Sequence, residues 1–350
     1  RDPDVILEYI ESCIQDQEMY YILLDEVQLL NEFEEVLNSL LHIDNADVYV
    51  TRSNSRFLSK DIITEFRGRG DEIHIFPLTF KEFMQVYEGD IYHGWADYML
   101  YGGLPLTVTM RTEEQKISYL TSLFEETYLK DIIERHHIEK TQELEDLVNI
   151  LASAIGSLTN VPKIESTFRS VLQSKISGNT IRQYIEYLED AFIIHKANRY
   201  NVKGRKYIGT PVKYYFEDVG LRNARLGFGQ VEETHLMENI IYNELRSRGY
   251  AVDVGIVEKR KKDVSGKAER KQLEIDFVAN KGSQRYYIQS AFAMPDEHKQ
   301  KQEKMSLLQV KDSFKKIIVV KDVVNVLRDE NGITTMSVYD FLLKDNSLEL

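Results

Sequence analysis

The chain has 350 residues, of which 43% are hydrophobic and 29% are charged, as is typical of a soluble globular protein with two or three domains. No apolar run approaches the roughly 20 residues that cross a bilayer, and the single cysteine, Cys13, excludes an internal disulfide and a cysteine-cluster metal site, so we expect a cytoplasmic protein that is not inserted in a membrane. The net charge of -13 argues against a simple nucleic-acid coat protein, whose surface would be basic.

The first 80 residues alternate between helix and strand patterns. Residues 4–15 and 32–43 have helical spacing, whereas residues 20–27 and 47–51 are short apolar runs. Such alternation predicts a parallel sheet flanked by helices.

The first of these strands, in the segment YYILLDEVQ at residues 20–28, ends in Asp25 and Glu26. A buried parallel strand delivers carboxylates in this way to a nucleotide and its metal. Asp25 would hold Mg²⁺ through water, because this small, hard cation keeps most of its waters. Glu26 would polarise the water that attacks the γ-phosphate of ATP. On this segment alone, a core strand that happens to end in two acids explains the pattern equally well.

Polar residues follow the second strand and precede the next element. Thr51, Ser53 and Asn54 stand where a neighbouring strand would present side chains to the same crevice. Within residues 66–83 (FRGRGDEIHIFPLTFKEF), Arg67 and Arg69 precede an expected strand and a proline-initiated helix. Either arginine could reach a nucleotide phosphate, in cis or from a neighbouring subunit, and solvated loop arginines are the equally weighted alternative.

Residues 81–140 have helical patterns throughout, with a turn at Gly102, Gly103 and Pro105 between two of the helices. The strings LLDEVQ, TRSNSRFLS, RGR followed by FPLTFKEF, and YGGLP occur in an order and spacing that resemble the AAA-type ATPases of bacteria and archaea. In that family an ATPase module is joined to a winged helix and a C-terminal nuclease-like domain.

The resemblance implies that Asp25 and Glu26 are the Walker B pair and that Thr51 to Asn54 are the sensor 1 region. It also implies ATP and Mg²⁺ as cofactors and a helical lid over residues 81–140. The chain departs from the family at Arg52, where a glycine is usual. This bulky cation beside the nucleotide crevice puts ordinary sensor geometry in doubt.

A larger departure is that no G-x-x-x-x-G-K-[ST] phosphate loop occurs in these residues. Without the backbone amides and lysine of that loop, the β- and γ-phosphates lose their main cradle. We therefore expect the chain to be a fragment of a longer protein and to bind ATP poorly. The alternative is a degenerate ATPase that serves as a binding or scaffold protein.

Residues 141–222 are predicted to form a winged helix, with three helices followed by two strands around the basic loop NVKGRKYIGTP. Arg182 and Gln183 on the third helix are candidate readers of DNA, but the acids that follow on this helix would repel phosphate. In the wing, the basic candidates are Lys203, Arg205 and Lys206. Packing between domains is the other use of such a fold.

Residues 230–350 contain a second set of acids. Glu238 lies on an expected helix, Asp276 on the strand LEIDFVA, and Gln289 with Ala291 on the strand YYIQSAF. The pattern resembles the PD-(D/E)XK nuclease fold, an α/β fold in which such residues surround Mg²⁺ ions. Ala291 stands where that family has a lysine, so the resemblance implies a domain that is inactive as a nuclease. Lys299 and Lys301 are alternative sources of the missing charge.

The sequence therefore predicts an α/β multidomain protein with a truncated ATPase core (1–80), a helical lid (81–140), a winged helix (141–222) and a nuclease-like domain (230–350). Three functions remain open, namely an ATP-driven switch acting on DNA or a protein partner, a scaffold, and a metal-dependent nuclease. Residues 258–271 and 298–305 are rich in lysine and could meet phosphates or be solvated. A role for Arg67 or Arg69 in trans would require a ring or dimer.

Overall fold

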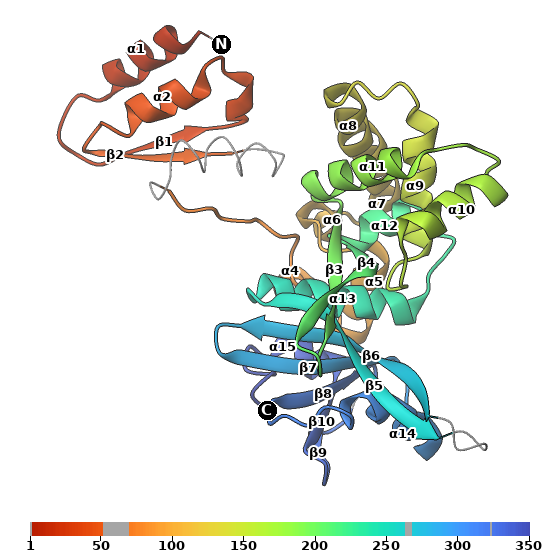
Figure 1. The fold of residues 1–350 in the computed structure, drawn as a ribbon. Coiled ribbons are helices and arrows are strands. Elements are labelled where there is room, and N and C mark those ends of the chain that lie inside the picture. The colour runs from red at the N-terminus through yellow and green to blue at the C-terminus, as the bar shows by residue number, and fades with distance from the viewer. Residues whose placement is uncertain (1, 52–69, 263–267, 323) are drawn as a thin grey trace. The chain divides into compact units, whose positions relative to one another are not determined.

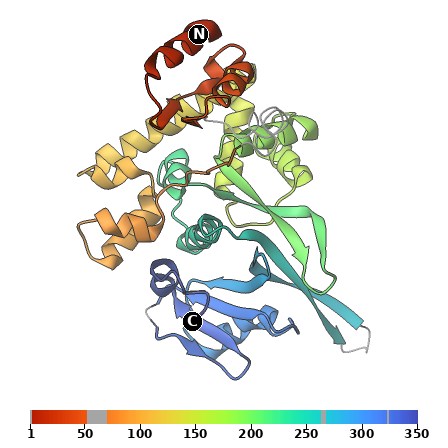
Figure 2. The ribbon, with the colours of Figure 1, turned by 90° about the vertical axis from the view of Figure 1, so that its left-hand side faces the viewer.

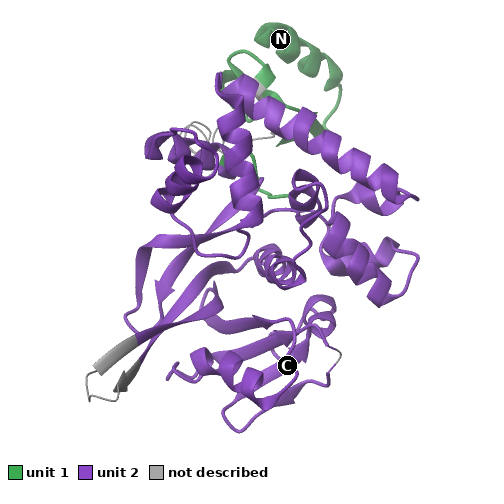
Figure 3. Ribbon diagram, turned by 90° about the vertical axis from the view of Figure 1, so that its right-hand side faces the viewer, with its two compact units in different colours: residues 1–75, 190–192 green, residues 76–189, 193–350 purple. Residues whose placement is uncertain are grey.

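We describe a computed structural model in which residues 2–51, 70–262, 268–322 and 324–350 are placed. It is a mixed α/β structure with many helices and one large mixed sheet (Figure 1 and Figure 2). The chain divides into two compact units (Figure 3). The first contains residues 1–75 and 190–192, and the second contains residues 76–189 and 193–350.

The first unit has the predicted alternation of helix and strand. Its elements are α1 (Pro3–Cys13), β1 (Tyr20–Leu24), the short 3-10 helix η1 (Val27–Leu29), α2 (Phe33–Leu40) and β2 (Ala46–Val50). The two strands pair in parallel from Tyr20↔Ala46 to Leu24↔Val50. Val36 and Leu40 of α2 are fully buried against α1 and one face of this small sheet. The period of four between them explains why α2 forms an apolar stripe.

The first strand was expected to be a buried parallel strand, and among the described residues it is parallel to β2 but packed on one face only. Along β1 and β2 the exposure alternates, with Tyr21, Leu23 and Tyr49 exposed and Ile22, Leu24 and Val48 packed towards the helices. A parallel strand needs helices on both faces to be buried throughout. Among the described residues, helices cover one face of β1.

The strand expected before Pro77 does not form. Residues 70–78 have neither helix nor strand, and Ile73 and Ile75 are exposed. The following helix, α4 (Phe80–Val86), begins three residues after Pro77 rather than at the proline. Its start is fixed by a capping box, in which the Thr79 side chain accepts from the Glu82 N–H and the Glu82 side chain accepts from the Thr79 N–H.

The helical predictions for residues 81–190 are confirmed as secondary structure. After α4 come α5 (Ile91–Tyr101), α6 (Pro105–Thr109), α7 (Glu113–Ser122), the π-helix η3 (Leu123–Leu129), α8 (Lys130–Arg135), α9 (Thr141–Ser153), α10 (Val161–Ser170) and α11 (Gly178–Asp190). Gly102 and Pro105 separate α5 from α6 as predicted, and the Ser177 side chain caps α11 by accepting from the Thr180 N–H.

The large sheet has the strand order β4-β3-β5-β6-β7-β8-β10-β9 among the described residues. Its strands are β3 (Ile194–Asn201), β4 (Lys206–Phe216), β5 (Ala251–Lys262), β6 (Ala268–Lys281), β7 (Gln284–Ala291), β8 (Lys315–Val320), β9 (Leu327–Arg328) and β10 (Ile333–Ser337). The hairpins β3–β4 and β5–β6 run side by side as long ribbons (Figure 2). The sheet is therefore continuous across residues 222–230, where a domain boundary was predicted.

Helices cover the two faces of this sheet. The helix α13 (Glu233–Ser247) packs on one face with residues such as Phe277, Ile288 and Ile317. The helix α14 (Glu297–Leu307) packs on the other face, where Leu307 meets Tyr287 and other strand residues. Two shorter helices, α12 (Val219–Arg225) and α15 (Val338–Leu343), complete the second unit.

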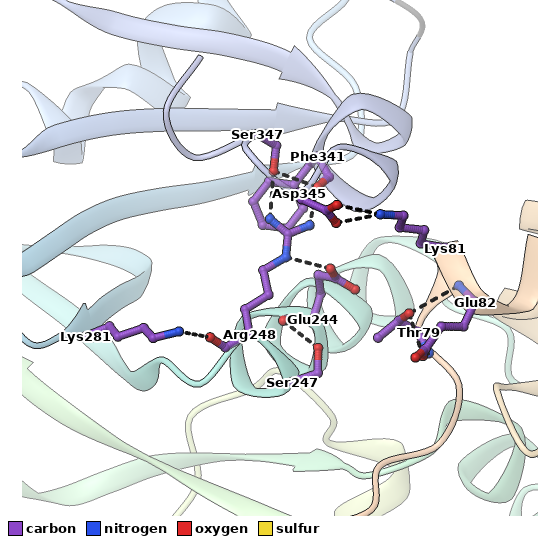
Figure 4. Close-up of polar contacts among 10 residues, drawn as sticks. All are labelled: Thr79, Lys81, Glu82, Glu244, Ser247, Arg248, Lys281, Phe341, Asp345 and Ser347. Carbon is purple, nitrogen blue, oxygen red and sulfur yellow. Dashed lines mark hydrogen bonds and ion pairs between the residues drawn. The ribbon is translucent and has the colours of Figure 1, made fainter.

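Arg248, just after α13, ties this helix to the C-terminal segment (Figure 4). Its guanidinium donates to Glu244 at 2.7 Å, to the Phe341 carbonyl at 2.7 Å and to the Ser347 hydroxyl at 2.8 Å. Lys281 donates to the Arg248 carbonyl at 2.7 Å. The end of α13 is thereby held to α15 and to the residue that ends β6.

Candidate functional sites

The ends of β1 and β2 bring three predicted residues together. The Thr51 hydroxyl donates to the Asp25 carboxylate and accepts from the Glu26 N–H at 3.0 Å. The Thr51 N–H in turn donates to the Leu24 carbonyl at 2.9 Å. Parallel pairing of the strands explains this meeting, because the carboxyl ends of parallel strands lie at one edge of a sheet.

The backbone at Glu26 has an uncommon conformation. Its φ of 51° and ψ of 52° lie in the left-handed region, which side chains other than glycine, asparagine and aspartate seldom adopt. The hydrogen bond from its N–H to Thr51 helps to hold this conformation. Such strain is concentrated at functional sites in proteins, so this outlier marks the turn after β1 as a candidate site.

The other residues predicted for this site are Ser53, Asn54, Arg67 and Arg69, together with the unusual Arg52. All of them lie outside the described residues. The structure therefore places Asp25, Glu26 and Thr51, of which Asp25 and Thr51 are exposed at the strand ends. Their carboxylate and hydroxyl oxygens are of the type that Mg²⁺ prefers.

A second group of charged side chains lies inside the second unit. The Lys213 ammonium on β4 is 2.8 Å from Glu238 on α13, 2.7 Å from Glu274 on β6 and 3.7 Å from Asp276 on β6. The side chains of Lys213, Glu238 and Asp276 are all more than nine-tenths buried. One buried cation thus meets three acidic side chains, of which Glu238 and Asp276 are buried with it and Glu274 is partly exposed.

Further hydrogen bonds fix the two buried acids. The Tyr215 hydroxyl donates to Glu238 at 2.6 Å, and the Ser290 N–H donates to Asp276 at 2.8 Å. Burial and the nearby Glu238 raise the pKa of Asp276 well above its usual range. Burial alone would lower the pKa of Lys213, but Glu238, Asp276 and Glu274 outweigh it and raise that pKa.

The structure brings Glu238 and Asp276 together as predicted, but it does not bring Gln289 to them. A register shift in the β5–β6 pairing, between Asp253 and Gly255, marks a bulge in β6 at Asp276 and Phe277. Phe277 packs with α13, on the side where Asp276 meets Glu238.

Gln289 instead lies on the α14 side of the sheet, where its side chain accepts from Ser306 of α14 at 3.4 Å. Ala291 packs on the same side with Leu307. The residue of β7 that meets Asp276 is Ser290, because successive strand residues point to opposite faces. The lysines considered as substitutes, Lys299 and Lys301, lie on α14 and pair with acids of that helix.

Sequence reasoning missed Lys213, Glu274 and Ser290. The available signal for Lys213 was a single lysine within the run Val212–Phe216, whose other residues are apolar or aromatic. Its partners follow 25 to 63 residues later in the chain, so no local sequence pattern predicts these ion pairs. Among the described residues, no group of three or more His, Cys, Asp or Glu side chains is arranged to hold a metal ion.

The predicted nucleic-acid candidates lie on two exposed surfaces. Arg182 and Gln183 are exposed on α11, where Arg182 donates to Asn179 at 2.6 Å and Gln183 donates to Tyr187 at 2.5 Å. Lys203, Arg205 and Lys206 are exposed at the β3–β4 turn, as predicted for a wing. An isolated antiparallel bridge between Thr159 and Val212 adds the segment before α10 to this hairpin.

The YGGLP segment has a packing role. The buried Asp218, which caps α12, accepts from the Gly103 N–H at 2.7 Å and from the Leu221 N–H at 3.0 Å. A side chain at Gly102, which has a φ of 75°, would place its Cβ 2.2 Å from Asp218, and one at Gly103 would place its Cβ 2.2 Å from the Leu78 carbonyl. Glycine is required at both positions because the backbone comes so close.

Two parts of the chain match known protein families. Residues 1–84 match a family described as an AAA domain, and residues 92–232 match a domain of unknown function, DUF8612. A protein of Haemophilus influenzae described as uncharacterized is 34% identical over 339 residues, which cover 95% of this chain and 80% of that protein. This chain belongs to the same family.

The chain is also similar to the uncharacterized protein MJ1544 of Methanocaldococcus jannaschii, which is 25% identical over 88% of this chain and 69% of that protein. The crystal structure of protein VC1899 from Vibrio cholerae aligns with 99% of this chain and 79% of that chain, at 11% identity and a TM-score of 0.25. The AAA-domain match confirms an AAA-type ATPase-like region at the N-terminus. Within the described ranges, every helix is too short or too polar to span a lipid bilayer.

Proposed function

We propose that the first unit binds Mg²⁺-ATP at the ends of β1 and β2 and hydrolyses ATP in the full-length protein. The observation that carries this proposal is the hydrogen-bonded group of Asp25, Glu26 and Thr51 at the carboxyl ends of adjacent parallel strands. Open parallel sheets bind their ligands at that edge. The match of residues 1–84 to an AAA domain supports the same assignment.

The residues present fit the metal and water side of such a site. Asp25 offers an exposed carboxylate for Mg²⁺, and the Thr51 hydroxyl holds that carboxylate in place by donating to it. Glu26, fixed through its N–H, orients the attacking water. The bound Mg²⁺ would offset negative charge on the phosphates. No G-x-x-x-x-G-K-[ST] sequence occurs in the 350 residues, so the phosphate cradle is not among them.

In this proposal Ser53 and Asn54 complete the sensor region, and Arg67 or Arg69 contacts a phosphate. The test is ATP turnover by the full-length protein carrying Glu26→Gln, which keeps the shape of the side chain and removes its charge. We expect turnover to fall by about 10²-fold or more. Glu35→Gln, an exposed acid on α2, is the matched control and should leave turnover unchanged. Equal turnover in all three proteins would refute the role of Glu26.

A second function, contact with nucleic acid, is favoured by the charge on the two long hairpins. The β3–β4 turn carries Lys203, Arg205 and Lys206 without an acid, whereas the whole chain has a net charge of -13. On the neighbouring hairpin, Lys259 pairs directly with Lys271, an arrangement of like charges that destabilises a hairpin unless an anion lies nearby. We propose that these hairpins bind the phosphates of duplex DNA, whose major groove admits a two-stranded ribbon.

In this proposal α11, the third helix of the winged-helix-like region, contributes less to DNA binding than the hairpins do. Its candidate residues are Arg182 and Gln183. The triple substitution of Lys203, Arg205 and Lys206 by alanine should weaken binding of a fluorescein-labelled duplex and flatten its salt dependence. A control with the same change of charge replaces three exposed basic residues that are not nucleic-acid candidates, namely Arg111, Lys130 and Lys140. If both triple variants bind DNA as the parent does, the hairpins are not the binding surface.

A further inference from the structure

The acids around Lys213 are of the kind that bind a divalent cation, but a lysine ammonium lies between them. Three carboxylates converge from two elements, α13 and β6, and hydrogen bonds from Tyr215 and Ser290 orient two of them. Carboxylate oxygens held by neighbouring donors are the usual ligands of Mg²⁺ and Mn²⁺. The centre is filled by the ammonium of a lysine from another strand.

We infer that Lys213 occupies the position of a divalent cation between Glu238, Glu274 and Asp276, so that this group of acids already holds a cation and binds no metal ion. The lysine offsets the charge that would otherwise be buried without a partner. Its removal should leave an acid-lined space in which a divalent ion restores the balance of charge. The Lys213 contacts of 2.7, 2.8 and 3.7 Å are longer than Mg²⁺–oxygen bonds of about 2.0–2.1 Å, so the three carboxylates would have to close in around a bound ion.

Burial supports this inference over a working metal-dependent nuclease. The side chains of Lys213, Glu238 and Asp276 are 3%, 8% and 9% exposed, and Glu274 alone is substantially in contact with water, at 32%. A phosphodiester must touch the metal and the attacking water, so it needs an open approach to these acids. Glu238 and Asp276 lack that approach.

The origin of the lysine supports the same conclusion. Lys213 lies on β4, which is separated from β6 by β3 and β5 in the sheet, and it pairs with Ala197 of β3. Its side chain nevertheless contacts the acids of β6 and α13. In place of a ligand from solvent, the group is closed by a side chain from the hairpin that precedes α13.

The experiment compares the parent chain with Lys213→Ala and Lys213→Gln, using MnCl₂ as the probe. Binding is followed by electron paramagnetic resonance of free Mn²⁺, and folding by the melting temperature with and without Mn²⁺. We expect the parent to show no Mn²⁺ binding and no shift in melting temperature that depend on Asp276. Lys213→Ala should bind one Mn²⁺ per chain and melt at a higher temperature when Mn²⁺ is present. The added substitution Asp276→Asn should abolish both effects.

Several outcomes would overturn the inference. Saturable Mn²⁺ binding by the parent that Asp276→Asn removes would mean that the metal site is open despite Lys213, as would Mn²⁺-dependent plasmid nicking lost in the same variant. Folded Lys213→Ala and Lys213→Gln proteins that bind no Mn²⁺ would show that the acids do not form a cation site. If neither variant folds even when refolded with Mn²⁺, the ion cannot replace the ammonium and the inference also fails.

Discussion

Asp218 illustrates how one buried carboxyl can link several elements. It caps α12 and accepts a hydrogen bond from the Gly103 N–H. At Gly102 and Gly103 there is no room for a side chain. Burial raises the pKa of Asp218 to about 6, although the backbone N–H groups of Gly103, Leu221 and Gly220 oppose that rise. The stability of this contact therefore depends on the protonation state of one residue.

The pKa of Asp218 predicts a pH dependence of stability. Because the folded pKa lies above the ordinary value of 3.8, the protonated carboxyl stabilises the fold below about pH 4, and this contribution is lost as the pH rises through about 6. The loss should approach about 3 kcal/mol in the free energy of unfolding. Asp218→Asn cannot ionise, so the difference in stability between parent and variant should shrink from pH 4 to pH 7 in urea titrations.

Asp218→Asn will be less stable than the parent at every pH, since its amide group cannot accept both N–H bonds. The prediction therefore concerns how the difference in the free energy of unfolding between parent and variant changes with pH, and not the size of that difference at one pH. A difference that is constant between pH 4 and pH 7 would mean that the carboxyl has the same pKa in the folded and unfolded chains.

The candidate sites could be predicted only where local pattern was enough. Asp25, Glu26 and Thr51 were identified because strand ends can be read from runs of apolar residues. Gln289 was assigned to the wrong side of the sheet, because strand alternation fixes which residues share a face but not which face meets α13. Lys213 could not be assigned, because its role depends on strand pairing between distant segments.

At the level of elements, one contact between α13 and β4 stands out. The fully buried Asn239 accepts the Phe216 N–H at 2.8 Å and donates to the Phe216 carbonyl at 2.7 Å. Its side-chain amide thus pairs with the last residue of β4 much as another strand would. The edge strand β4 is thereby joined to the helix that carries Glu238.

We predict that Asn239→Ala lowers the free energy of unfolding by about 2 to 4 kcal/mol, because the buried N–H of Phe216 loses its partner. Asn198→Ala, at an exposed position on the neighbouring strand β3, should change stability by less than about 0.5 kcal/mol. Denaturant titration measures both. A small effect at Asn239 would show that another group, such as Asn243, takes over its hydrogen bonds.

Secondary structure was predicted well where periodicity was strong and less well where a partner strand was required. The helices of residues 81–190 and the strands around Asp276 formed as expected. The segment containing Ile73 and Ile75 alternates like a strand but remains without strand structure among the described residues. Alternation alone cannot form a strand, because a strand requires a neighbour to pair with its backbone.

At the scale of the whole molecule, the predicted boundary between a winged helix and a nuclease-like domain crosses a continuous sheet. β3 and β4 come from the first of these regions, and β5 to β10 from the second. The predicted domains ended at residue 222 and began again at residue 230, but the pairing of β3 with β5 is a long-range contact that no local pattern reveals. The two compact units divide instead near residue 75.

Each unit has its own apolar clusters, so we predict that each unfolds in its own transition. The single tryptophan, Trp95, is buried in the second unit and reports on that unit by its fluorescence. Leu40→Ala, in the first unit, should lower the free energy of unfolding of that unit by about 2 to 5 kcal/mol, as followed by circular dichroism. The midpoint of the Trp95 fluorescence transition should stay unchanged.

The matched variant Phe277→Ala should do the reverse and shift the Trp95 transition, because both residues belong to one buried cluster. A fluorescence midpoint that moves with Leu40→Ala would indicate that the two units unfold as a single cooperative body.

The four charged residues at positions 213, 238, 274 and 276 are constrained as a set. Loss of the lysine would leave three acids together without a cation, and loss of an acid would remove one of the partners that stabilise the buried ammonium. Evolutionary change at one of these positions should therefore be accompanied by change at another. A homologue that received β6 from a different lineage would lack suitable acids for the lysine on its β4 strand. Recombination within this sheet is therefore expected to be rare.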